Sequence, residues 1–472
     1  MCIRDRGDPD QTIYTWRGAK IDIIMQFDRD FPDCKTIVLN ENYRSTPSIL
    51  NGANALIANN RNRIKKELFT NAKDEGKIIH FSAMDDYNEP IWIAAKARAI
   101  HMTGVNYRDI AVLYRSNYLS RPLEKAMLEA QIPYRIYGGI RFYDRAEIKD
   151  ALSYLRLCLD TSAIDLAMRR IVNVPKRGVG EKSIEALEQY AREHHCNLYE
   201  AVKANEVVKG KAKANLEQFV KVIEHARARL ETVSISILLK DLLEESGYLS
   251  ALQEEKELER LDNIKELIAD IEHYEEENPQ GSLDDYLQTI SLYTDKEEEL
   301  ADQDFIQLMS IHAAKGLEFD YVFVYSLSEG IFPNERSVAE GGAAAMEEER
   351  RLAYVAFTRA KKNLFISDAQ GYSFILDRLK RTSRFVSEID PDCIEHVGLA
   401  KKEEVKEGNA FVEANTWKSA NLNEQTTSRK GNLRKGDKVR HKAFGAVSYT
   451  HLITTCCRSL PLLHIQWPTS PD

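Results

Sequence analysis

Short apolar runs of the β type alternate with helical segments near both ends of this chain, and a long stretch between them contains no such run. The runs TIVLN (36–40) and DIAVLYR (109–115) are each followed by apolar residues at helical spacing, whereas FIQLMSI (305–311) and YVFVYSL (321–327) flank a polar loop. Strands that alternate with helices predict a parallel sheet of the α/β class. From about 147 to 300 the sequence is helical and charged, which predicts an all-helical domain inserted into the α/β domain.

The charge balance excludes a protein that coats nucleic acid with a uniformly basic surface. The chain carries 65 Lys and Arg against 74 Asp and Glu, a net charge of −9, so any nucleic-acid site must be a local basic groove. The seven cysteines form no CxxC pair and no zinc-type cluster with histidine, which predicts reduced thiols and no metal site of that kind. No run approaches 18 apolar residues, and the first residues lack the apolar core of a signal peptide. We therefore expect a cytoplasmic protein without a membrane contact.

The segment GDPDQTIYTWRGA, residues 7–19, joins acidic and amide side chains to aromatic and basic ones. Carboxylates and an amide suit a metal-bound phosphate, whereas aromatic rings beside an arginine suit the bases of a single strand. An Asp/Pro/Gly turn above a core tryptophan is the simpler interpretation of this segment on its own. The residues concerned are Asp8, Asp10 and Gln11 in the first group, and Tyr14, Trp16 and Arg17 in the second.

The segment NENYRS, residues 40–45, directly follows the predicted strand at 36–40. This order places Tyr43 and Arg44 at the carboxyl edge of a sheet, where α/β proteins bind ligands. There Tyr43 could stack on a base and Arg44 could reach a phosphate. A surface salt bridge is the more frequent explanation of such a pair.

The loop after FIQLMSI combines a hydroxyl, an imidazole, a cation and a flexible backbone, all suited to phosphate oxygens. These residues are Ser310, His312, Lys315 and Gly316. Glu318, at the end of the loop, could accept hydrogen bonds from ribose hydroxyls. A single histidine is more often structural, and the absence of a GxSxG string argues against a Ser/His hydrolase.

The segment MEEERRLAYVAFTRAKK, residues 346–362, is predicted to form an amphipathic helix with Leu352 and Val355 on its apolar stripe. Arg359 continues that stripe. An arginine on the buried face of a helix needs an anion, and both a transferring phosphate and an internal carboxylate would serve.

Two more segments suit nucleic-acid phosphates. VPKRGVGEKSIEAL, from residue 174, places a basic turn with Lys176, Gly178 and Gly180 before a helix, whose free backbone amides suit a duplex phosphate. A simple loop at a helix start explains it nearly as well. The polar cluster after DIAVLYR suits single-strand phosphates or plain solvated surface, and consists of Arg115, Ser116, Asn117 and Arg121.

Taken in order, GDPDQTIYTWRGA, NYRS, LYRSN, FYDRAEIKD, VPKRGVG, MSIHAAKGLEFDYVF, EGIFP and EEERRLAYVAFTRAKK resemble the motifs of UvrD/PcrA/Rep-type DNA helicases of superfamily 1. The resemblance runs from residue 7 to about 392. It implies a 3′ to 5′ DNA translocase with two RecA-like domains, ATP and Mg²⁺ between them, and single-stranded DNA across their tops. The implied partners are single strands, junctions with duplex, and repair or replication proteins that bind the carboxyl-terminal region.

The resemblance also implies roles for individual residues. On the nucleotide side, Gln11 would sense the γ-phosphate, Tyr43 would stack on adenine, and Glu318 would touch the ribose. The paired arginine fingers would be Arg44 and Arg359, with Gly316 beside them. The DNA strand would contact Tyr14, Trp16, Arg17, Arg115, Asn117, Ser310 and His312, while Lys176, Gly178 and Gly180 would grip duplex. A strand ending near Tyr372 and Phe374 would form the pin that splits base pairs.

The implied domains follow the motifs along the chain. They are a remnant of the first RecA-like domain (1–38), the second RecA-like domain (39–148 and 303–392), the inserted helical domain (149–302), a flexible linker (393–430), the start of a β domain (431–446) and a non-native tail (447–472).

Two catalytic strings of the family are missing from the sequence. No GxxxxGK[ST] phosphate loop occurs, and no DExQ string follows an apolar strand. Without the loop lysine and the magnesium carboxylates, the chemistry has no phosphate cradle and no metal site. We therefore expect a fragment that starts at the GDPDQ motif and is inactive alone.

Two other functions stay open. A non-catalytic module that binds DNA or docks a partner would have a genuine start at Met1 and a folded tail. A helicase-nuclease relative would need a nuclease domain downstream, yet nothing acidic and metal-like follows residue 392.

Overall fold

In this computed structural model, the chain divides into two compact units, Met1–Glu413 and Ala414–Asp472. The structure describes residues 6–73, 76–161, 163–300, 304–373, 375–399, 438–441 and 445–448. In the second unit, strands β10 (Lys438–His441) and β11 (Gly445–Ser448) pair as an antiparallel hairpin. This hairpin crosses the predicted boundary between the β domain and the non-native tail at 446/447.

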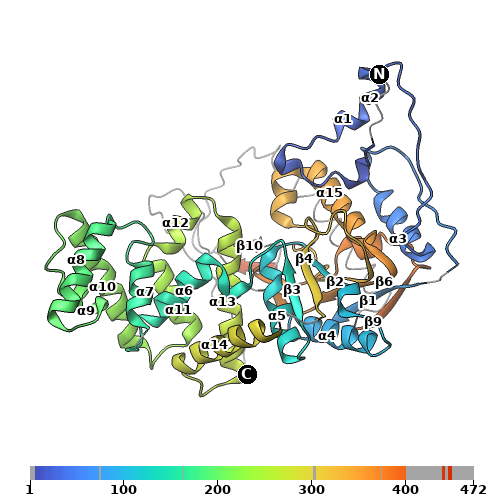
Figure 1. Ribbon diagram of the computed structural model, residues 1–472. Coiled ribbons are helices and arrows are strands. Elements are labelled where there is room, and N and C mark those ends of the chain that lie inside the picture. The colour runs from blue at the N-terminus through green and yellow to red at the C-terminus, as the bar shows by residue number, and fades with distance from the viewer. Residues whose placement is uncertain are drawn as a thin grey trace. The chain divides into compact units, whose positions relative to one another are not determined.

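The first unit is built on a sheet of seven parallel strands in the order β3-β4-β2-β5-β6-β1-β9 (Figure 1). The strands are β1 (Ile78–Ala83), β2 (Ile110–Tyr114), β3 (Tyr134–Tyr137), β4 (Ile306–Ser310), β5 (Phe319–Val324), β6 (Ala360–Ala369) and β9 (Ile394–Gly398). Strand β2 lies between β4 and β5, which follow it by about 200 residues in the sequence. The chain therefore returns to the same sheet after the helical insertion, and the predicted α/β class is confirmed.

Side chains of the strands alternate between two buried faces of the sheet. In β2, Ala111 and Leu113 join one apolar core, whereas Ile110 and Val112 join the other, as the two-residue period of a strand requires. Because both faces are covered, all five residues of β2 are buried, which explains its continuous apolar run.

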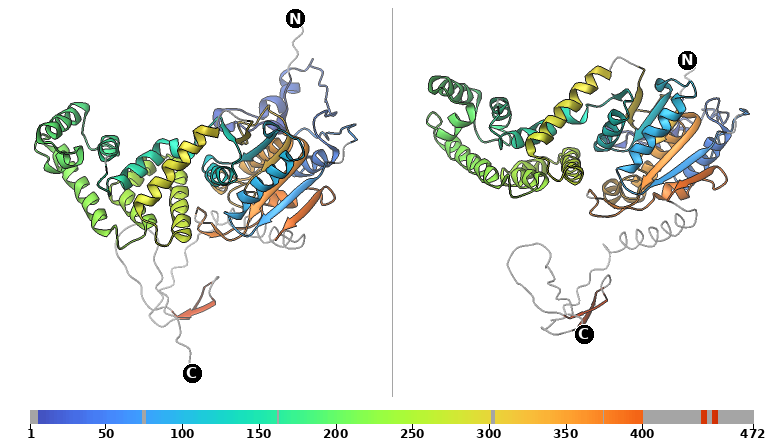
Figure 2. Two further views of the ribbon diagram at one scale, coloured as in Figure 1. Left: turned by 60° about the horizontal axis from the view of Figure 1, so that its bottom comes forward. Right: turned by 90° about the horizontal axis from the view of Figure 1, so that it is seen from below.

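Helices cover each face, as Figure 2 shows. Helices α3 and α15 supply apolar residues to one core, and helices α4 and α5 supply them to the other. Their bounds are α3 (Pro47–Ile57), α4 (Asn88–His101), α5 (Ser120–Glu129) and α15 (Glu335–Phe357). No helix in the described part of the chain is long and apolar enough to cross a membrane.

Between β3 and β4 the described residues form helices and no strand, and these helices form a third apolar core of their own. They are α6 (Ala146–Arg156), α7 (Ile164–Ile171), α8 (Glu181–His194), α9 (Leu198–Ala204), α10 (Lys211–Arg229), α11 (Ile235–Glu245), α12 (Tyr248–Glu254), α13 (Leu258–Glu277) and α14 (Leu283–Leu300). The predicted helical insertion is confirmed, while its limits at 149 and 302 stay predictions.

Short elements connect these parts. They are η1 (Pro9–Gln11), η2 (Thr15–Arg17), α1 (Asp22–Met25), α2 (Phe27–Asp30), η3 (Tyr107–Asp109), η4 (Asn117–Leu119), η5 (Phe142–Asp144), β7 (Tyr372–Ser373), β8 (Arg378–Leu379) and α16 (Arg384–Ser387).

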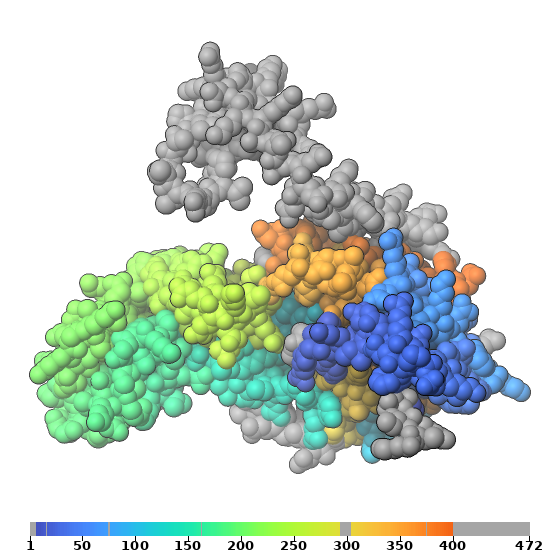
Figure 3. Space-filling view, turned by 90° about the horizontal axis from the view of Figure 1, so that it is seen from above, coloured from blue at the N-terminus to red at the C-terminus, as the bar shows by residue number. Residues whose placement is uncertain are grey.

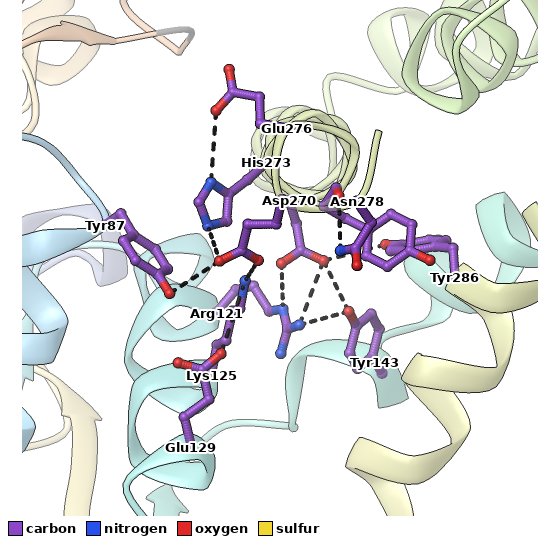
Figure 4. A network of polar contacts seen from close by, with 12 residues as sticks. Tyr87, Arg121, Lys125, Glu129, Tyr143, Asp270, His273, Glu276, Asn278 and Tyr286 are labelled. Atoms are coloured by element: carbon purple, nitrogen blue, oxygen red, sulfur yellow. Dashed lines mark hydrogen bonds and ion pairs between the residues drawn. The ribbon is translucent and has the colours of Figure 1, made fainter. Parts of the chain in front are cut away.

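A polar network joins the sheet domain to the helical insertion (Figure 4). Arg121 on α5 is 2% exposed, and its Nε lies 3.2 Å from Oδ1 of Asp270 on α13. The Tyr143 hydroxyl donates to Asp270 Oδ2 at 2.9 Å and accepts from Arg121 Nη2 at 2.7 Å. The prediction that Arg121 belongs to a surface patch for DNA phosphates is therefore wrong. Its side chain is buried and forms an ion pair with Asp270, 149 positions away in the sequence.

Two predicted segments differ from the structure. Residues 36–40 form no strand, and the only pairing described beside them is an isolated bridge between Glu41 and Phe69. The side chains of Ile37 and Leu39 are 70% and 75% exposed, so no core covers this run. An apolar run needs a partner strand and a covering core to become a strand. Conversely, β9 lies inside the predicted linker 393–430, where it pairs with β1. As an edge strand with half-exposed side chains it carries no long apolar run to reveal it, and residues 400–430 lie outside the described part.

The helix predicted at 346–362 also has different limits. Helix α15 starts at Glu335 and ends at Phe357. The Thr358 hydroxyl then donates to the Tyr354 and Val355 carbonyls at 2.9 and 3.1 Å, and β6 begins at Ala360. Because the chain must turn into a sheet strand at this point, the helical pattern stops before Arg359.

Candidate functional site

The predicted nucleotide residues gather at the amino ends of β5 and β6. Arg44 Nε donates to Glu318 Oε2 at 2.6 Å, and Arg44 Nη1 donates to the Thr358 carbonyl at 3.2 Å. Lys361 Nζ lies 3.1 Å from the other Glu318 oxygen. These hydrogen bonds to Arg44 and Lys361 hold the pKa of Glu318 below its usual value. Residues that are more than 270 positions apart thus form one charged cluster.

The prediction that Tyr43 and Arg44 follow a strand at the carboxyl edge of the sheet is wrong. Residues 36–40 form no strand of the sheet, and the Ser45 hydroxyl instead donates to the carbonyl of Ala360, the first residue of β6, at 2.6 Å. This contact fixes NYRS at the opposite, amino edge. Tyr43 is 86% exposed there, and its hydroxyl donates to Glu41 Oε2 at 2.7 Å, a bond that raises the pKa of Tyr43.

Arg359 is buried in the turn between α15 and β6, with 2% of its surface exposed. Its guanidinium donates to the Val355 carbonyl at 2.9 Å, the Leu317 carbonyl at 3.0 Å and the Thr358 hydroxyl at 3.2 Å. No carboxylate of a described residue lies within ion-pair distance of it. Burial, together with the charge of Arg44, lowers the pKa of Arg359 to about 10. The arginine therefore carries a desolvated charge whose hydrogen bonds go to neutral acceptors, while Glu318 and Asp8 act on it only from beyond ion-pair distance, and this arrangement favours an added anion.

The loop 311–318 connects the nucleotide residues to the opposite edge of the sheet. It leaves the carboxyl end of β4 and reaches the amino end of β5, so His312 and Glu318 lie at opposite edges. Gly316 adopts a φ of +92°, in the left-handed region that glycine favours. Ser310, at the end of β4, accepts a hydrogen bond at its hydroxyl from the Ala313 amide at 3.3 Å.

The segment 6–18 lies against α15 and the loop 311–318, as Figure 3 shows for the blue N-terminal residues beside orange α15. Lys315 Nζ donates to the Gln11 carbonyl at 2.9 Å, and Arg351 Nε donates to the Thr12 carbonyl at 3.0 Å. The Gln11 side chain turns back to donate to Asp8 Oδ2 at 2.7 Å. One cation therefore holds the main chain of Gln11, the predicted phosphate sensor, and a second holds the next residue, Thr12.

Two further cations hold the carboxylates of the same segment. Asp10 is fully buried, and Arg63 Nη2 donates to it at 3.0 Å. Lys66 Nζ pairs with Asp8 and lies 3.8 Å from Asp10. Burial outweighs these charges, so the pKa of Asp10 is raised.

Two of the predicted strand-path residues of this segment, Tyr14 and Arg17, lie near His312. The Tyr14 hydroxyl donates to the His312 carbonyl at 2.8 Å, and Arg17 and Lys315 lie over the Tyr14 ring at 5.6 and 5.3 Å. Burial, with the charges of Arg115 and Arg17, lowers the pKa of His312 to about 4. The imidazole is therefore neutral at pH 7. The side chain of Trp16 lies outside the described part.

Arg115 and Asn117 are engaged by acidic side chains. Arg115 Nη2 and Nε donate to Glu349 at 2.7 and 3.0 Å, and Asn117 Nδ2 donates to Glu259 on α13. Burial alone would lower the pKa of Arg115, but the charge of Glu349 raises it above its usual value. A DNA phosphate at Arg115 would have to share this guanidinium with Glu349, and both DNA roles stay predictions.

The VPKRGVG turn lies in the helical insertion, away from the sheet edges. Lys176 is exposed, Gly178 has a φ of +78°, and Gly180 is the N-cap of α8 without a side-chain cap. Arg177 is 6% exposed and donates to the Ile171 carbonyl at 2.8 Å. Its buried guanidinium holds the turn rigidly, so that the exposed residues beside it have a fixed position.

The predicted pin corresponds in place to the hairpin of β7 and β8. Tyr372 is 46% exposed and pairs across the hairpin with Leu379, which is 69% exposed. Phe374 lies outside the described residues, and the function of the hairpin stays a prediction.

Sequence reasoning missed the cations that hold the N-terminal segment. Arg63 and Lys66 stand in an unremarkable basic stretch, and Arg351 is one of several charges in EEERR. What distinguishes them is a partner in the segment 6–18, which is a carboxylate for Arg63 and Lys66 and a carbonyl for Arg351. Local spacing does not reveal partners more than 50 positions away. Among the described residues, no group of three or more His, Cys, Asp and Glu is arranged to hold a metal ion.

Comparison with known proteins gives concordant matches along the chain. A family model described as the UvrD-like helicase C-terminal domain matches residues 37–371, and the UvrD/REP helicase N-terminal domain matches residues 6–32. The ATP-dependent DNA helicase PcrA of Bacillus subtilis (strain 168) is 41% identical over 410 residues, which cover 84% of this chain and 55% of that protein. PcrA of Staphylococcus aureus (strain MRSA252) is 37% identical over 453 residues, which cover 93% of this chain and 61% of that protein. The chain thus spans 55% to 61% of the length of these curated relatives.

Proposed function

Because the chain belongs to the UvrD-like helicase family, we propose that it supplies the second RecA-like domain and the helical insertion of an ATP-driven 3′ to 5′ DNA translocase. The observation that carries this proposal is the loop 311–318, which connects two clusters. At one end Arg44, Glu318 and Arg359 form a cluster that could bind an anion, here called the anion-receptive cluster. At the other end Tyr14 and His312 form a cluster that could bind a DNA strand, here called the strand-receptive cluster. A nucleotide and a DNA strand bound at opposite edges of one sheet would be coupled through this loop.

The residues at the amino edge fit the triphosphate of ATP. Arg359 offers a buried guanidinium without a carboxylate, and Arg44 lies in an exposed pair that an incoming phosphate can replace. Glu318 would be released from Arg44 to meet the ribose, and Tyr43 is exposed for a base. Hydrolysis of bound ATP would supply the free energy for translocation. Because the described residues contain no group of three or more His, Cys, Asp and Glu arranged to hold a metal ion, none of them is proposed to bind magnesium.

The N-terminal segment would transmit the state of the nucleotide cluster. Lys315 and Arg351 hold the Gln11 and Thr12 carbonyls, and Tyr14, two residues later, touches the His312 carbonyl. A movement of Gln11 would therefore shift Tyr14 and Arg17 on the strand side. Stacking and phosphate contacts of this kind give sequence-tolerant, salt-sensitive binding.

Fluorescence anisotropy with labelled oligo-dT and mixed-sequence single strands tests the DNA function. The wild-type chain should bind both equally well, and Tyr14→Ala should weaken both. Tyr190→Ala, on α8 in the helical insertion, is the control and should bind as the wild type does. Equal affinity of the Tyr14→Ala and wild-type chains would remove the strand-receptive cluster from the proposal.

We also propose that this polypeptide alone hydrolyses no ATP, because its sequence has no GxxxxGK[ST] string to cradle the phosphates. Phosphate release should match that of an Arg359→Ala variant, with and without single-stranded DNA. DNA-stimulated release above that control would contradict this part of the proposal.

A further inference from the structure

Hydrogen bonds fix the main chain on both sides of Tyr43. The Asn42 side-chain oxygen accepts from the amides of Arg44 and Ser45 at 2.8 and 2.9 Å. The Asn42 amide in turn donates to the Phe69 carbonyl at 2.8 Å. The conformational freedom left at Tyr43 therefore lies in its own side chain, which is 86% exposed.

Glu41 holds that side chain in one orientation. One carboxylate oxygen of Glu41 accepts from the Tyr43 hydroxyl at 2.7 Å, and the other accepts from Asn71 Nδ2 at 2.6 Å. The main chain of Glu41 forms the isolated bridge with Phe69. The carboxylate is thus anchored through one oxygen and holds the phenol through the other.

The direction of this hydrogen bond suits a ring that receives a ligand on its face. The hydroxyl lies at the edge of the ring, so its bond to Glu41 leaves the ring faces open for stacking. An exposed aromatic side chain loses rotational freedom when a ligand stacks on it, and holding the ring beforehand reduces this entropy loss. A carboxylate repels phosphate groups, so Glu41 is unsuited to bind the triphosphate itself.

We propose that Glu41 is a positioning residue, which orients the ring of Tyr43 for stacking on the base of the nucleotide. This inference rests on the proposed function, which assigns the triphosphate to Arg44 and Arg359 and the base to Tyr43. Glu41 acts on the nucleotide only through Tyr43. Its loss should therefore affect ligands that carry a base and no others.

The test compares ATP with ribose 5-triphosphate, which is ATP without its base. ³¹P NMR titration of the full chain follows both ligands through the same phosphate signals and gives a dissociation constant for each. Glu41→Ala, and Tyr43→Phe, which removes only the hydroxyl, should each weaken ATP binding about two- to tenfold, as expected when one side chain must be immobilised on binding. Neither variant should bind ribose 5-triphosphate differently from the wild type. An unchanged affinity for ATP in Glu41→Ala, or an equal loss for both ligands, would overturn the inference.

Two more variants test the hydrogen bond itself. In Glu41→Gln the amide oxygen can still accept from the Tyr43 hydroxyl, so the affinity for ATP should stay within about twofold of the wild type. Glu41→Ala/Tyr43→Phe should lose no more affinity than either single variant, because each single change breaks the same bond. A loss in Glu41→Gln as large as in Glu41→Ala, or additive losses in the double variant, would contradict the positioning role.

The matched control removes a neighbouring negative charge. Glu67 is also exposed and forms no ion pair with another described residue, so Glu67→Ala should bind both ligands as the wild type does. A loss of ATP affinity equal to that of Glu41→Ala would overturn the inference. A wild-type chain that binds both ligands equally well would overturn the inference and leave the phosphate contacts of the proposed function intact. A chain that binds neither ligand would overturn the nucleotide site of the proposed function as well.

Discussion

Two buried arginines, Arg121 at the junction with the helical insertion and Arg359 at the amino edge of the sheet, are equally hidden but differently balanced. Each is 2% exposed. Arg121 faces the Asp270 carboxylate, so although burial opposes its charge, its pKa is raised well above the usual value. Arg359 meets only carbonyls and a hydroxyl, and burial beside Arg44 lowers its pKa to about 10. A buried arginine that pairs with a carboxylate stabilises the contact between two parts of the molecule. A buried arginine that is hydrogen-bonded only to neutral groups, here called unbalanced, favours the binding of an anion.

The largest effect should come from breaking the balanced pair. Asp270→Ala leaves Arg121 buried without its Asp270 ion pair and should lower the free energy of unfolding by about 3 to 5 kcal/mol. Urea unfolding followed by circular dichroism measures this. The double variant Arg121→Leu/Asp270→Leu removes both charges and should recover most of the loss. A loss below about 1 kcal/mol for Asp270→Ala would show that the junction does not depend on this pair.

His312 sharpens the comparison, since its surroundings also disfavour positive charge. Burial, with Arg115 and Arg17, lowers its pKa from 6.5 to about 4, so between these pH values the unfolded chain binds a proton that the folded chain does not. Stability should therefore fall by up to roughly 3 kcal/mol as the pH drops through this window. Urea unfolding at several pH values should show this component in the wild type and not in His312→Gln. The same slope in both chains would exclude His312 as its source.

Arg359→Met should behave differently from the loss of Asp270. The variant loses the hydrogen bonds of Arg359 to carbonyls, but it also no longer pays the cost of burying a charge. Because these two effects oppose each other, the free energy of unfolding should change by less than about 1.5 kcal/mol. Urea unfolding beside Asp270→Ala checks this. A loss as large as that of Asp270→Ala would make Arg359 a structural residue like Arg121.

The smallest effect is expected at the exposed pair of Arg44 and Glu318. Their side chains are 28% and 45% exposed, so Glu318→Gln should change stability by less than about 1 kcal/mol. Thermal unfolding at low and high salt measures this, with Lys362→Gln, which breaks the exposed pair with Asp320, as the control. A larger change at Glu318 than at the control would mean that the cluster is needed for folding.

The spacing of apolar residues along the sequence was enough to predict the sheet and its helical insertion. Strands such as β2 are buried on both faces and therefore appear as continuous apolar runs. The spacing was insufficient at TIVLN, where a strand-like run lacks a covering core. The apolar spacing correctly predicted that Arg359 is buried, although the helix ends two residues before it. Whether a buried arginine has a carboxylate partner depends on contacts such as that of Arg121 with Asp270, 149 positions away, which local pattern does not contain.

The most direct test follows the guanidinium groups themselves. The protein is labelled with ¹⁵N at arginine Nε and studied by NMR. The signals of Arg359 and Arg121 are assigned by their loss in Arg359→Met and Arg121→Leu, and tripolyphosphate is then added in steps. The unbalanced charge predicts that the Arg359 signal shifts saturably together with that of Arg44, while the Arg121 signal stays in place. An Arg359 signal that does not respond, or an Arg121 signal that shifts equally, would contradict the assignment of the amino edge as the anion site.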